Sequence, residues 1–276
     1  MGPIIRIDLY IQFVVSRTNE YIMKKSFFTK TLFFVAFAAL IFSACDSNSD
    51  SKSGAKTNSQ DEKMYVKDSR DGNVYRTVRM GSQIWMAENL NYAYKQPTAT
   101  KDSSSFCFNN DPDYCKTYGR LYLWSAAMDS AGVFSSHSKG CGNRVLCNYA
   151  TSVRSVCPEG WHVPNVAEFV TLMESAGDDN FVGRRLKSKH GWESRIDKQK
   201  NGNGSDDYGF SAIPTGFYQS EGKYKNGGFF GSGSNFWSAN SRNYIFAKTM
   251  EIGVDESAYE SFEAKSVALA VRCVKD

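Results

Sequence analysis

Residues 157–177, CPEGWHVPNVAEFVTLMESAG, carry the clearest helix signal in the chain. Asn165 followed by Glu168 three positions later is typical of a capping box, and Gly177 predicts the point where the helix stops. The apolar side chains expected on one face of this helix are Val166, Phe169, Val170 and Met173. This stretch therefore predicts an amphipathic helix that packs against a core.

Strand signals lie on both sides of this helix. Val74–Met80 alternates its side chains, Gly81 and Ser82 form a turn signal, and Gln83–Met86 returns, which predicts a hairpin. Gly119–Trp124 predicts a further strand, followed by a helix over Ser125–Ala131 that ends at Gly132, and a second short helix is expected over Phe181–Lys187. Later strand-like segments are Gly209–Pro214, Gly216–Lys225, Asn235–Ala239, Tyr244–Glu251 and Val267–Val274. The pattern favours an α+β fold.

Composition narrows the class of protein. The 276 residues include 33 Lys+Arg and 29 Asp+Glu, a formal charge of +4 that is weak for a nucleic-acid binder of this length. The aromatic share of 14% supplies a core and excludes disorder of the whole chain. Residues 64–276 contain no linker and no internal repeat, so we expect them to form one folded domain. Nucleic acid is not an expected partner.

The N-terminal part of the chain is typical of an export signal. Basic residues precede the eleven-residue apolar run Leu32–Phe42, which is too short to span a bilayer and ends in Ser43-Ala44-Cys45. We interpret residues 23–44 as a lipoprotein signal peptide. Cys45 is then the acceptor of diacylglycerol and of fatty acids such as palmitate, because the site resembles a bacterial lipobox. The alternative is an ordinary secretory signal with an incidental cysteine.

The segments around this signal have separate interpretations. Residues 1–22 resemble an over-extended start, because Met23 begins a complete signal layout. Residues 45–63 comprise the lipidated cysteine and a polar stretch in which Ala55 is the only apolar side chain, which predicts a flexible tether. We expect an exported protein held to the cell envelope by its lipid, at the outer membrane or cell surface; the alternative is the inner membrane, because Asp46 directly after the cysteine resembles a retention signal. The membrane is thus the first expected partner.

If Cys45 carries lipid, six cysteines remain, an even number that is typical of disulfides in an exported domain. Six cysteines allow 15 connectivities. Short spacing favours Cys107–Cys115 and Cys141–Cys147, which leaves Cys157 and Cys273 as the third pair. A structural zinc site is not expected, because no CxxC occurs and the three histidines, 137, 162 and 190, are scattered.

Six strings occur in an order that resembles one family, the Fibrobacter succinogenes major paralogous domain. They are residues 81–90 (GSQIWMAENL), 118–124 (YGRLYLW), 157–164 (CPEGWHVP), 209–214 (GFSAIP), 236–238 (FWS) and 271–276 (VRCVKD). The family is one of exported bacterial proteins with no defined biochemical role, and the resemblance covers nearly all of residues 64–276.

The resemblance implies a C-type-lectin-like fold, with small twisted antiparallel sheets, two main helices and long loops. It also supports the Cys157–Cys273 disulfide, which resembles the lectin-like link between the region before a helix and the final strand. The fold is related in outline to the formylglycine-generating domain, whose members act through a cysteine pair. Here each remaining cysteine has a structural partner, so we expect no enzyme.

Sugar binding is the function that such a fold suggests. The calcium-binding triplet Glu-Pro-Asn of lectin-like domains is absent, and the strand that would carry Trp-Asn-Asp has the sequence Trp237-Ser238-Ala239-Asn240. No cofactor is therefore expected. The alternative is calcium in the oxygen-rich loop 201–207, with the candidate ligands Asn203, Asp206 and Asp207.

Sugar can also be bound on aromatic faces without metal. The candidate ligand surface is a set of loop aromatics next to glycines: Trp192, Tyr218, Tyr224, Phe229 and Phe230. Core packing is the alternative for all of them, and Phe229 and Phe230 are the hardest to explain as core. Trp85, Trp124, Trp161 and Trp237 are expected in the core.

Catalytic patterns are missing from the sequence. No HExxH motif, phosphate-binding loop or nucleotide fingerprint occurs, and His162 is expected to make a structural hydrogen bond rather than act as a base. The sequence thus predicts a lectin-like binding module whose partner is a polysaccharide or a surface protein. The alternatives are a structural or assembly component of the cell surface and an enzyme on a degenerate formylglycine-generating scaffold.

Overall fold

The computed structural model describes residues 65–96, 104–149, 152–193, 201–219 and 227–276. The predicted signal, start and tether segments, with Cys45, lie outside the described residues. The chain divides into the units Met1–Asn58 and Ser59–Asp276. Every described helix and strand, both core clusters and all three disulfides lie in the second unit, which therefore holds its own core. None of the described helices has the length and apolar character needed to cross a membrane.

The first sheet has five strands in the order β1-β2-β3-β11-β6, and every pair is antiparallel. Its strands are β1 (Tyr65–Lys67), β2 (Val74–Met80), β3 (Gln83–Met86), β11 (Val274–Lys275) and β6 (Trp161–His162). The predicted hairpin is confirmed as β2 and β3, with Met80 opposite Gln83 at the turn. The last strand of the chain lies inside this sheet, between β3 and β6.

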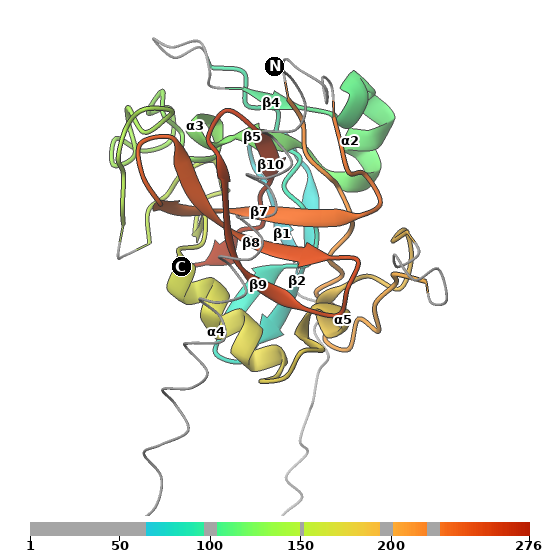
Figure 1. Ribbon diagram of the computed structural model, residues 1–276. Coiled ribbons are helices and arrows are strands. Elements are labelled where there is room, and N and C mark those ends of the chain that lie inside the picture. Colours follow the sequence, from blue (N-terminus) through green and yellow to red (C-terminus); the bar gives the residue numbers. More distant parts are fainter. Residues whose placement is uncertain (1–64, 97–103, 150–151, 194–200, 220–226) are drawn as a thin grey trace, which may run out of the picture. The chain divides into compact units, whose positions relative to one another are not determined.

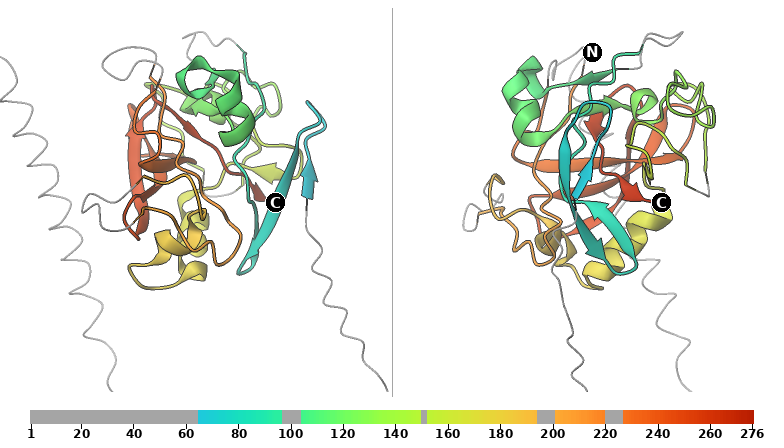
Figure 2. Two further views of the ribbon diagram at one scale, coloured as in Figure 1. Left: turned by 90° about the vertical axis from the view of Figure 1, so that its right-hand side faces the viewer. Right: turned by 180° about the vertical axis from the view of Figure 1, so that it is seen from behind.

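The second sheet has six strands in the order β4-β5-β10-β7-β8-β9. They are β4 (Ser105–Phe106), β5 (Leu121–Leu123), β10 (Ala268–Ala270), β7 (Gly233–Ser241), β8 (Phe246–Gly253) and β9 (Ala258–Ala264). All neighbours are antiparallel except β10 and β7, which pair in parallel at Ala270 and Phe236. This sheet and the β1–β2 hairpin lie on opposite sides of the domain (Figure 2).

Helices are few and short, as Figure 1 shows. They are the 3-10 turn η1 (Phe108–Asn110) and the α-helices α2 (Pro112–Tyr118), α3 (Trp124–Ala127), α4 (Val166–Ala176) and α5 (Val182–Leu186). Helix α2 was not expected from the sequence. It begins with a proline in its first turn and with Asp111, whose side chain accepts a hydrogen bond from the Asp113 amide. The α+β class is confirmed.

Helix α4 has the predicted bounds and the predicted capping box. The buried face differs, however, since it consists of Phe169, Leu172 and Ala176, whereas Val170 is 36% exposed. Phe169 stacks on Trp85 with ring centroids 5.4 Å apart. Met173 is partly buried against the same core, so the buried face is shifted toward Leu172 and Ala176 relative to the expected one.

Two other segments differ from expectation. The helix predicted over Ser125–Ala131 is shorter, because Asp129 has a positive φ and its carboxylate accepts hydrogen bonds from the amides of Val133, Phe134 and Ser135. Gly209–Pro214 forms only one bridge, between Ala212 and Lys187. Ser211 there has a φ of 53°, which an extended strand cannot accommodate.

Three disulfides brace the domain: Cys107–Cys115, Cys141–Cys147 and Cys157–Cys273. They are the pairs expected from the sequence. Trp85, Trp124 and Trp237 are fully buried and Trp161 is nearly so, in two core clusters that fill the space around the sheets. Trp237 Nε1 donates to the carbonyl of Tyr122 and Trp124 Nε1 donates to that of Ser238, so the indoles also tie β5 and α3 to β7.

Candidate functional site

A cavity of about 280 Å³ opens between the first sheet and α2. Its walls come from five parts of the chain: the start of β2 with the residue before it, the segment after β3, the end of α2, the loop with Ser211 and Ile213, and Arg272 just before β11. The residues concerned are 73–76, 87–89, 91, 115–119, 211, 213 and 272. The lining is mainly polar, with both charge signs present.

Glu88 and Arg76 form an ion pair in the lining of this cavity. The Glu88 carboxylate accepts hydrogen bonds from the Arg76 amide at 2.8 Å and from Arg76 Nε at 3.3 Å. Their side chains are 42% and 48% exposed, so solvent reaches both groups. A half-exposed carboxylate keeps free lone pairs, and it can therefore accept hydrogen bonds from the hydroxyl groups of a bound molecule.

Asn89 joins two walls of the cavity. Its Nδ2 donates to the carbonyl of Tyr118 at 3.0 Å, and its Oδ1 accepts from Arg272 Nε at 2.9 Å. The residue is buried, so both ends of its amide depend on these partners. Asn89 thus sets the distance between α2 and the chain near β11.

Arg272 is fully buried and shapes the far wall. Its remaining nitrogens donate to the carbonyls of Phe210 and Ser211, and the guanidinium lies 4.3 Å from the Phe210 ring centroid. Burial lowers the pKa of Arg272 to about 9. Among the described residues no carboxylate forms an ion pair with Arg272, so hydrogen bonds to neutral oxygens stabilise its charge. Its burial makes Arg272 a positioning residue rather than a ligand contact.

Gly119 allows the close approach that forms the cavity. Its φ is 78°, and a Cβ at this position would lie 2.7 Å from Asn89 Cβ and 2.9 Å from the Asn89 carbonyl oxygen. No other residue fits without moving the backbone. The end of α2 therefore lies directly against Asn89.

Tyr75 and Asn91 complete the polar wall. The Tyr75 hydroxyl accepts a 3.0 Å hydrogen bond from the Asn91 amide, and burial raises the pKa of Tyr75 to about 12. Asn91 lines the cavity, and its side-chain oxygen is buried without a hydrogen-bond partner among the described residues.

The comparisons with known proteins give a family but no function. Residues 78–275 match the family model of the Fibrobacter succinogenes major domain. The chain belongs to this family. No curated protein and no solved structure matches it.

Four of the six strings that carry the family resemblance meet at the cavity. They contribute Glu88 and Asn89, Tyr118 and Gly119, Ser211 and Ile213, and Arg272. In this member of the Fibrobacter succinogenes major domain family, strings that lie far apart in sequence therefore line one cavity. Sequence reasoning missed this site. The available signal was a glutamate and an asparagine, Glu88 and Asn89, at the end of residues 81–90, together with Arg272 between two valines of the last string.

The expected aromatic surface does not form as a unit. Trp192 and Tyr218 are 5% and 7% exposed, which favours the core-packing alternative for these two rings. Tyr218 stacks on Phe106 with centroids 4.1 Å apart, and Trp192 Nε1 donates to the carbonyl of Ala212. These partners bury rings that the neighbouring glycines were expected to expose.

The three other aromatics have different surroundings. Phe230 packs against Phe108, Tyr114 and Tyr118 in one aromatic cluster. Phe229 is 58% exposed and contacts Phe217. Tyr224 lies outside the described residues.

Two of the three candidate calcium ligands stabilise loops through hydrogen bonds of their side chains. Both carboxylate oxygens of Asp206 accept hydrogen bonds from Ser211, and Asn203 Oδ1 accepts from the Trp192 amide. Asp207 is exposed. In the described ranges no group of three or more His, Cys, Asp or Glu side chains is placed to bind a metal ion.

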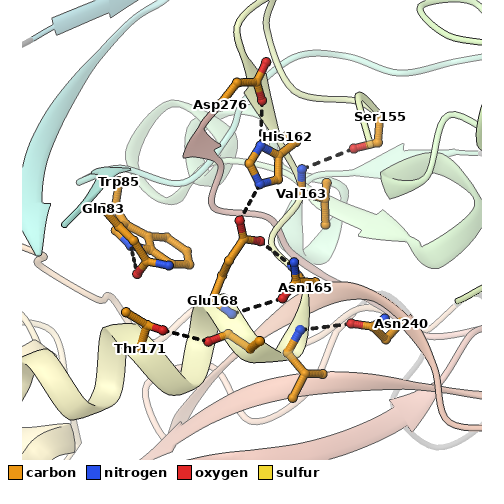
Figure 3. A network of polar contacts seen from close by, with 12 residues as sticks. Gln83, Trp85, Ser155, His162, Val163, Asn165, Glu168, Thr171, Asn240 and Asp276 are labelled. Atoms are coloured by element: carbon orange, nitrogen blue, oxygen red, sulfur yellow. Dashed lines mark hydrogen bonds and ion pairs between the residues drawn. The ribbon is translucent and has the colours of Figure 1, made fainter. Parts of the chain in front are cut away.

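His162 lies between two carboxylates, as Figure 3 shows. Its Nδ1 is 2.6 Å from Asp276 Oδ1, and its Nε2 is 2.8 Å from Glu168 Oε1. Burial of the ring acts to lower the pKa of His162, but the hydrogen bonds and charges of Glu168 and Asp276 together raise it above its ordinary value. An imidazolium donates to both carboxylates at once. The arrangement is a structural clamp between α4, β6 and the last strand.

Proposed function

We propose that the domain is a carbohydrate-binding module and that its ligand lies in the cavity between the first sheet and α2. The observation that carries this proposal is the pairing of the half-exposed Glu88 carboxylate with the exposed Arg76 guanidinium on one small cavity that Asn89 and Asn91 also line. Sugar hydroxyls donate and accept hydrogen bonds, so they suit a wall that offers both roles. The small volume favours one sugar unit over a long ligand.

A binding role is favoured over catalysis. The six cysteines among the described residues are all disulfide-bonded, so none offers the thiol that formylglycine-generating chemistry needs. His162 is engaged by two carboxylates away from the cavity lining. We therefore propose a module with a lectin-like fold that binds without chemical change and without calcium.

We further propose that Cys45 anchors the protein to the cell envelope by lipid, at the outer membrane or cell surface. The support is the sequence of residues 23–63, in which a short apolar run and a cysteine are followed by a polar tether. Cys45→Ala should release the protein from the membrane fraction and abolish labelling by fatty acid. Unchanged fractionation of this variant would reject the anchor.

Pull-down on insoluble polysaccharides tests the binding proposal. The folded unit, residues 59–276, is incubated with cellulose, xylan, chitin and cell-wall fractions, with and without a chelator. We expect retention on at least one of them that the chelator leaves unchanged. Glu88→Gln should weaken retention about tenfold, since a charged acceptor is lost.

Glu174→Gln, which changes an exposed carboxylate on α4, is the matched control and should bind as the wild type does. Failure to bind any glycan or wall fraction would overturn the proposal. That outcome would favour a structural or assembly component of the cell surface.

A further inference from the structure

Two loops of the domain together form an exposed apolar surface, here called the apex. It consists of Val145 and Leu146 on one loop and Tyr244 and Ile245 on the turn between β7 and β8. Their exposed fractions are 40%, 49%, 62% and 54%. The two loops lie side by side (Figure 1), and the Arg144 amide donates to the Tyr244 carbonyl at 2.8 Å. None of these side chains lines the cavity.

The apex is fixed by covalent and polar links. The Cys141–Cys147 disulfide closes the first loop. The Cys147 amide donates to Ser241 Oγ, and the Ser241 amide donates back to the Cys147 carbonyl, which joins this loop to the end of β7. The four apolar side chains are therefore presented on a braced support rather than on a free loop.

Lys265 lies beneath the apex with an exposed fraction of 1%. Its ammonium donates to the carbonyls of Val145 and Asn243 at 2.6 and 3.0 Å and to Ser241 Oγ at 2.8 Å. It also lies 4.3 Å from the centroid of the Trp124 ring. Burial lowers the pKa of Lys265 to about 8. A buried ammonium thus satisfies backbone oxygens from both loops.

Other backbone groups of the turn are also satisfied internally. The Ile245 carbonyl accepts from the Lys265 amide, and the amides of Ile245 and Phe246 donate to Asn243 Oδ1. With the bonds of Lys265 and Arg144, the carbonyls of residues 243, 244 and 245 all have protein donors. Water satisfies the backbone groups of a turn that stays exposed to solvent. A turn that enters an apolar medium needs protein partners for its backbone groups, because unsatisfied ones are costly there.

Two exposed arginines flank the apolar side chains. Arg144 precedes Val145 and Arg242 lies two residues before Tyr244, and neither makes an ion pair with a carboxylate among the described residues. The Arg242 guanidinium lies over the Phe262 ring at 3.4 Å. Apolar and aromatic tips with basic flanks fit the boundary between lipid headgroups and acyl chains, where arginine reaches the phosphates.

We propose that the apex docks on the surface of an anionic lipid bilayer, with Leu146 and Ile245 entering the apolar layer and Arg144 and Arg242 pairing with headgroup phosphates. Exposed apolar area and unpaired arginine also suit protein partners. The carbonyls of Val145 and of residues 243, 244 and 245 already have protein donors, which favours the bilayer, because protein interfaces supply hydrogen-bond partners and lipid chains do not. The inference is independent of the proposed glycan site.

Vesicle sedimentation of residues 59–276, which lack the lipid acceptor, tests this inference. We expect binding to vesicles of phosphatidylcholine with phosphatidylglycerol, and weaker binding to phosphatidylcholine alone. Leu146→Ser with Ile245→Ser should reduce binding about tenfold or more, because two inserted side chains are lost. Arg144→Gln with Arg242→Gln should remove the dependence on phosphatidylglycerol.

Phe181→Ser with Tyr208→Ser is the matched control. It removes two apolar side chains of similar exposure, 45% and 41%, from outside the apex and should leave vesicle binding unchanged. Equal vesicle binding by the wild type and the Leu146/Ile245 variant would overturn the proposal. Dimers in solution that this variant abolishes would also overturn it, since a second copy would then be the occupant. Circular dichroism confirms that each variant is folded.

Discussion

The Nε of Arg272 donates a 2.9 Å hydrogen bond to Oδ1 of Asn89, a residue that lies 183 positions earlier in the chain. The same amide holds the Tyr118 carbonyl through its Nδ2. One buried side chain therefore links the segment after β3, the end of α2 and the segment before β11. The cavity exists because these three parts are held at a fixed distance.

Asn89→Ala should destabilise the domain by about 2–4 kcal/mol, since the buried Arg272 loses a partner and the Tyr118 carbonyl loses its donor. Urea unfolding measures the change. Asn91→Ala is the matched control, because the Asn91 side-chain oxygen has no partner to lose. It should cost less than Asn89→Ala, and equal losses would show that the Asn89 links contribute nothing specific.

Gly119→Ala should destabilise the domain more than a glycine replacement at an open site. Both Gly119 and Gly140 have positive φ, 78° and 83°, but a Cβ at Gly140 meets nothing within 4 Å. The control Gly140→Ala should therefore cost about 1–2 kcal/mol for the backbone conformation alone. Gly119→Ala adds the collision with Asn89. Thermal unfolding compares the two, and similar melting temperatures would contradict the close packing.

His162 should make stability depend on pH. Its pKa is raised in the folded state, so its contribution is fully present below the ordinary value of 6.5 and is lost as pH rises through the folded-state pKa. The difference in unfolding free energy between the wild type and His162→Gln should thus be largest in mild acid and shrink above neutral pH. His190→Gln, at an exposed ring, should stay close to the wild type at every pH. A difference in unfolding free energy between the wild type and His162→Gln that grows with pH would contradict a raised pKa of His162 in the folded state.

The three disulfides should contribute unequally. Cys157 and Cys273 are separated by 116 residues and Cys107 and Cys115 by 8. In the chain-entropy model these closures are worth about 5 and about 2.5 kcal/mol. Paired replacement by alanine should therefore lower the free energy of unfolding about twice as much for the long closure. Guanidinium unfolding of the two double variants measures the ratio, and a larger loss for the short loop would contradict this ranking.

Local signals in the sequence predicted local structure well. The capping box of α4 and the turn between β2 and β3 depend on residues within a few positions of each other, and both were found in place. Strand β9 was not predicted, since its Tyr259, Glu260 and Ser261 do not alternate cleanly and its pairing with β8 supplies the order.

The cavity could not be predicted from local pattern. Arg272 and Asn89 meet only when the last segment of the chain joins the first sheet, and no periodicity reports such a meeting. The burial of Tyr218 could not be predicted for the same reason. The ring that buries it, Phe106, lies far away in sequence and in a short strand that the composition of residues 105–106 does not suggest.

Strand β11 occupies an interior position in its sheet, between β3 and β6. Residues 274–275 emerge from a ribosome or an export channel after all other strands of this sheet. The position between β3 and β6 therefore stays empty until they emerge. The sheet cannot close, and Cys157 cannot meet its partner, while the chain is still being threaded. The domain is thus kept unfinished during passage and completes its core in one late, long-range step. That order of events fits the export that we propose for this chain, because the domain then becomes rigid only after passage.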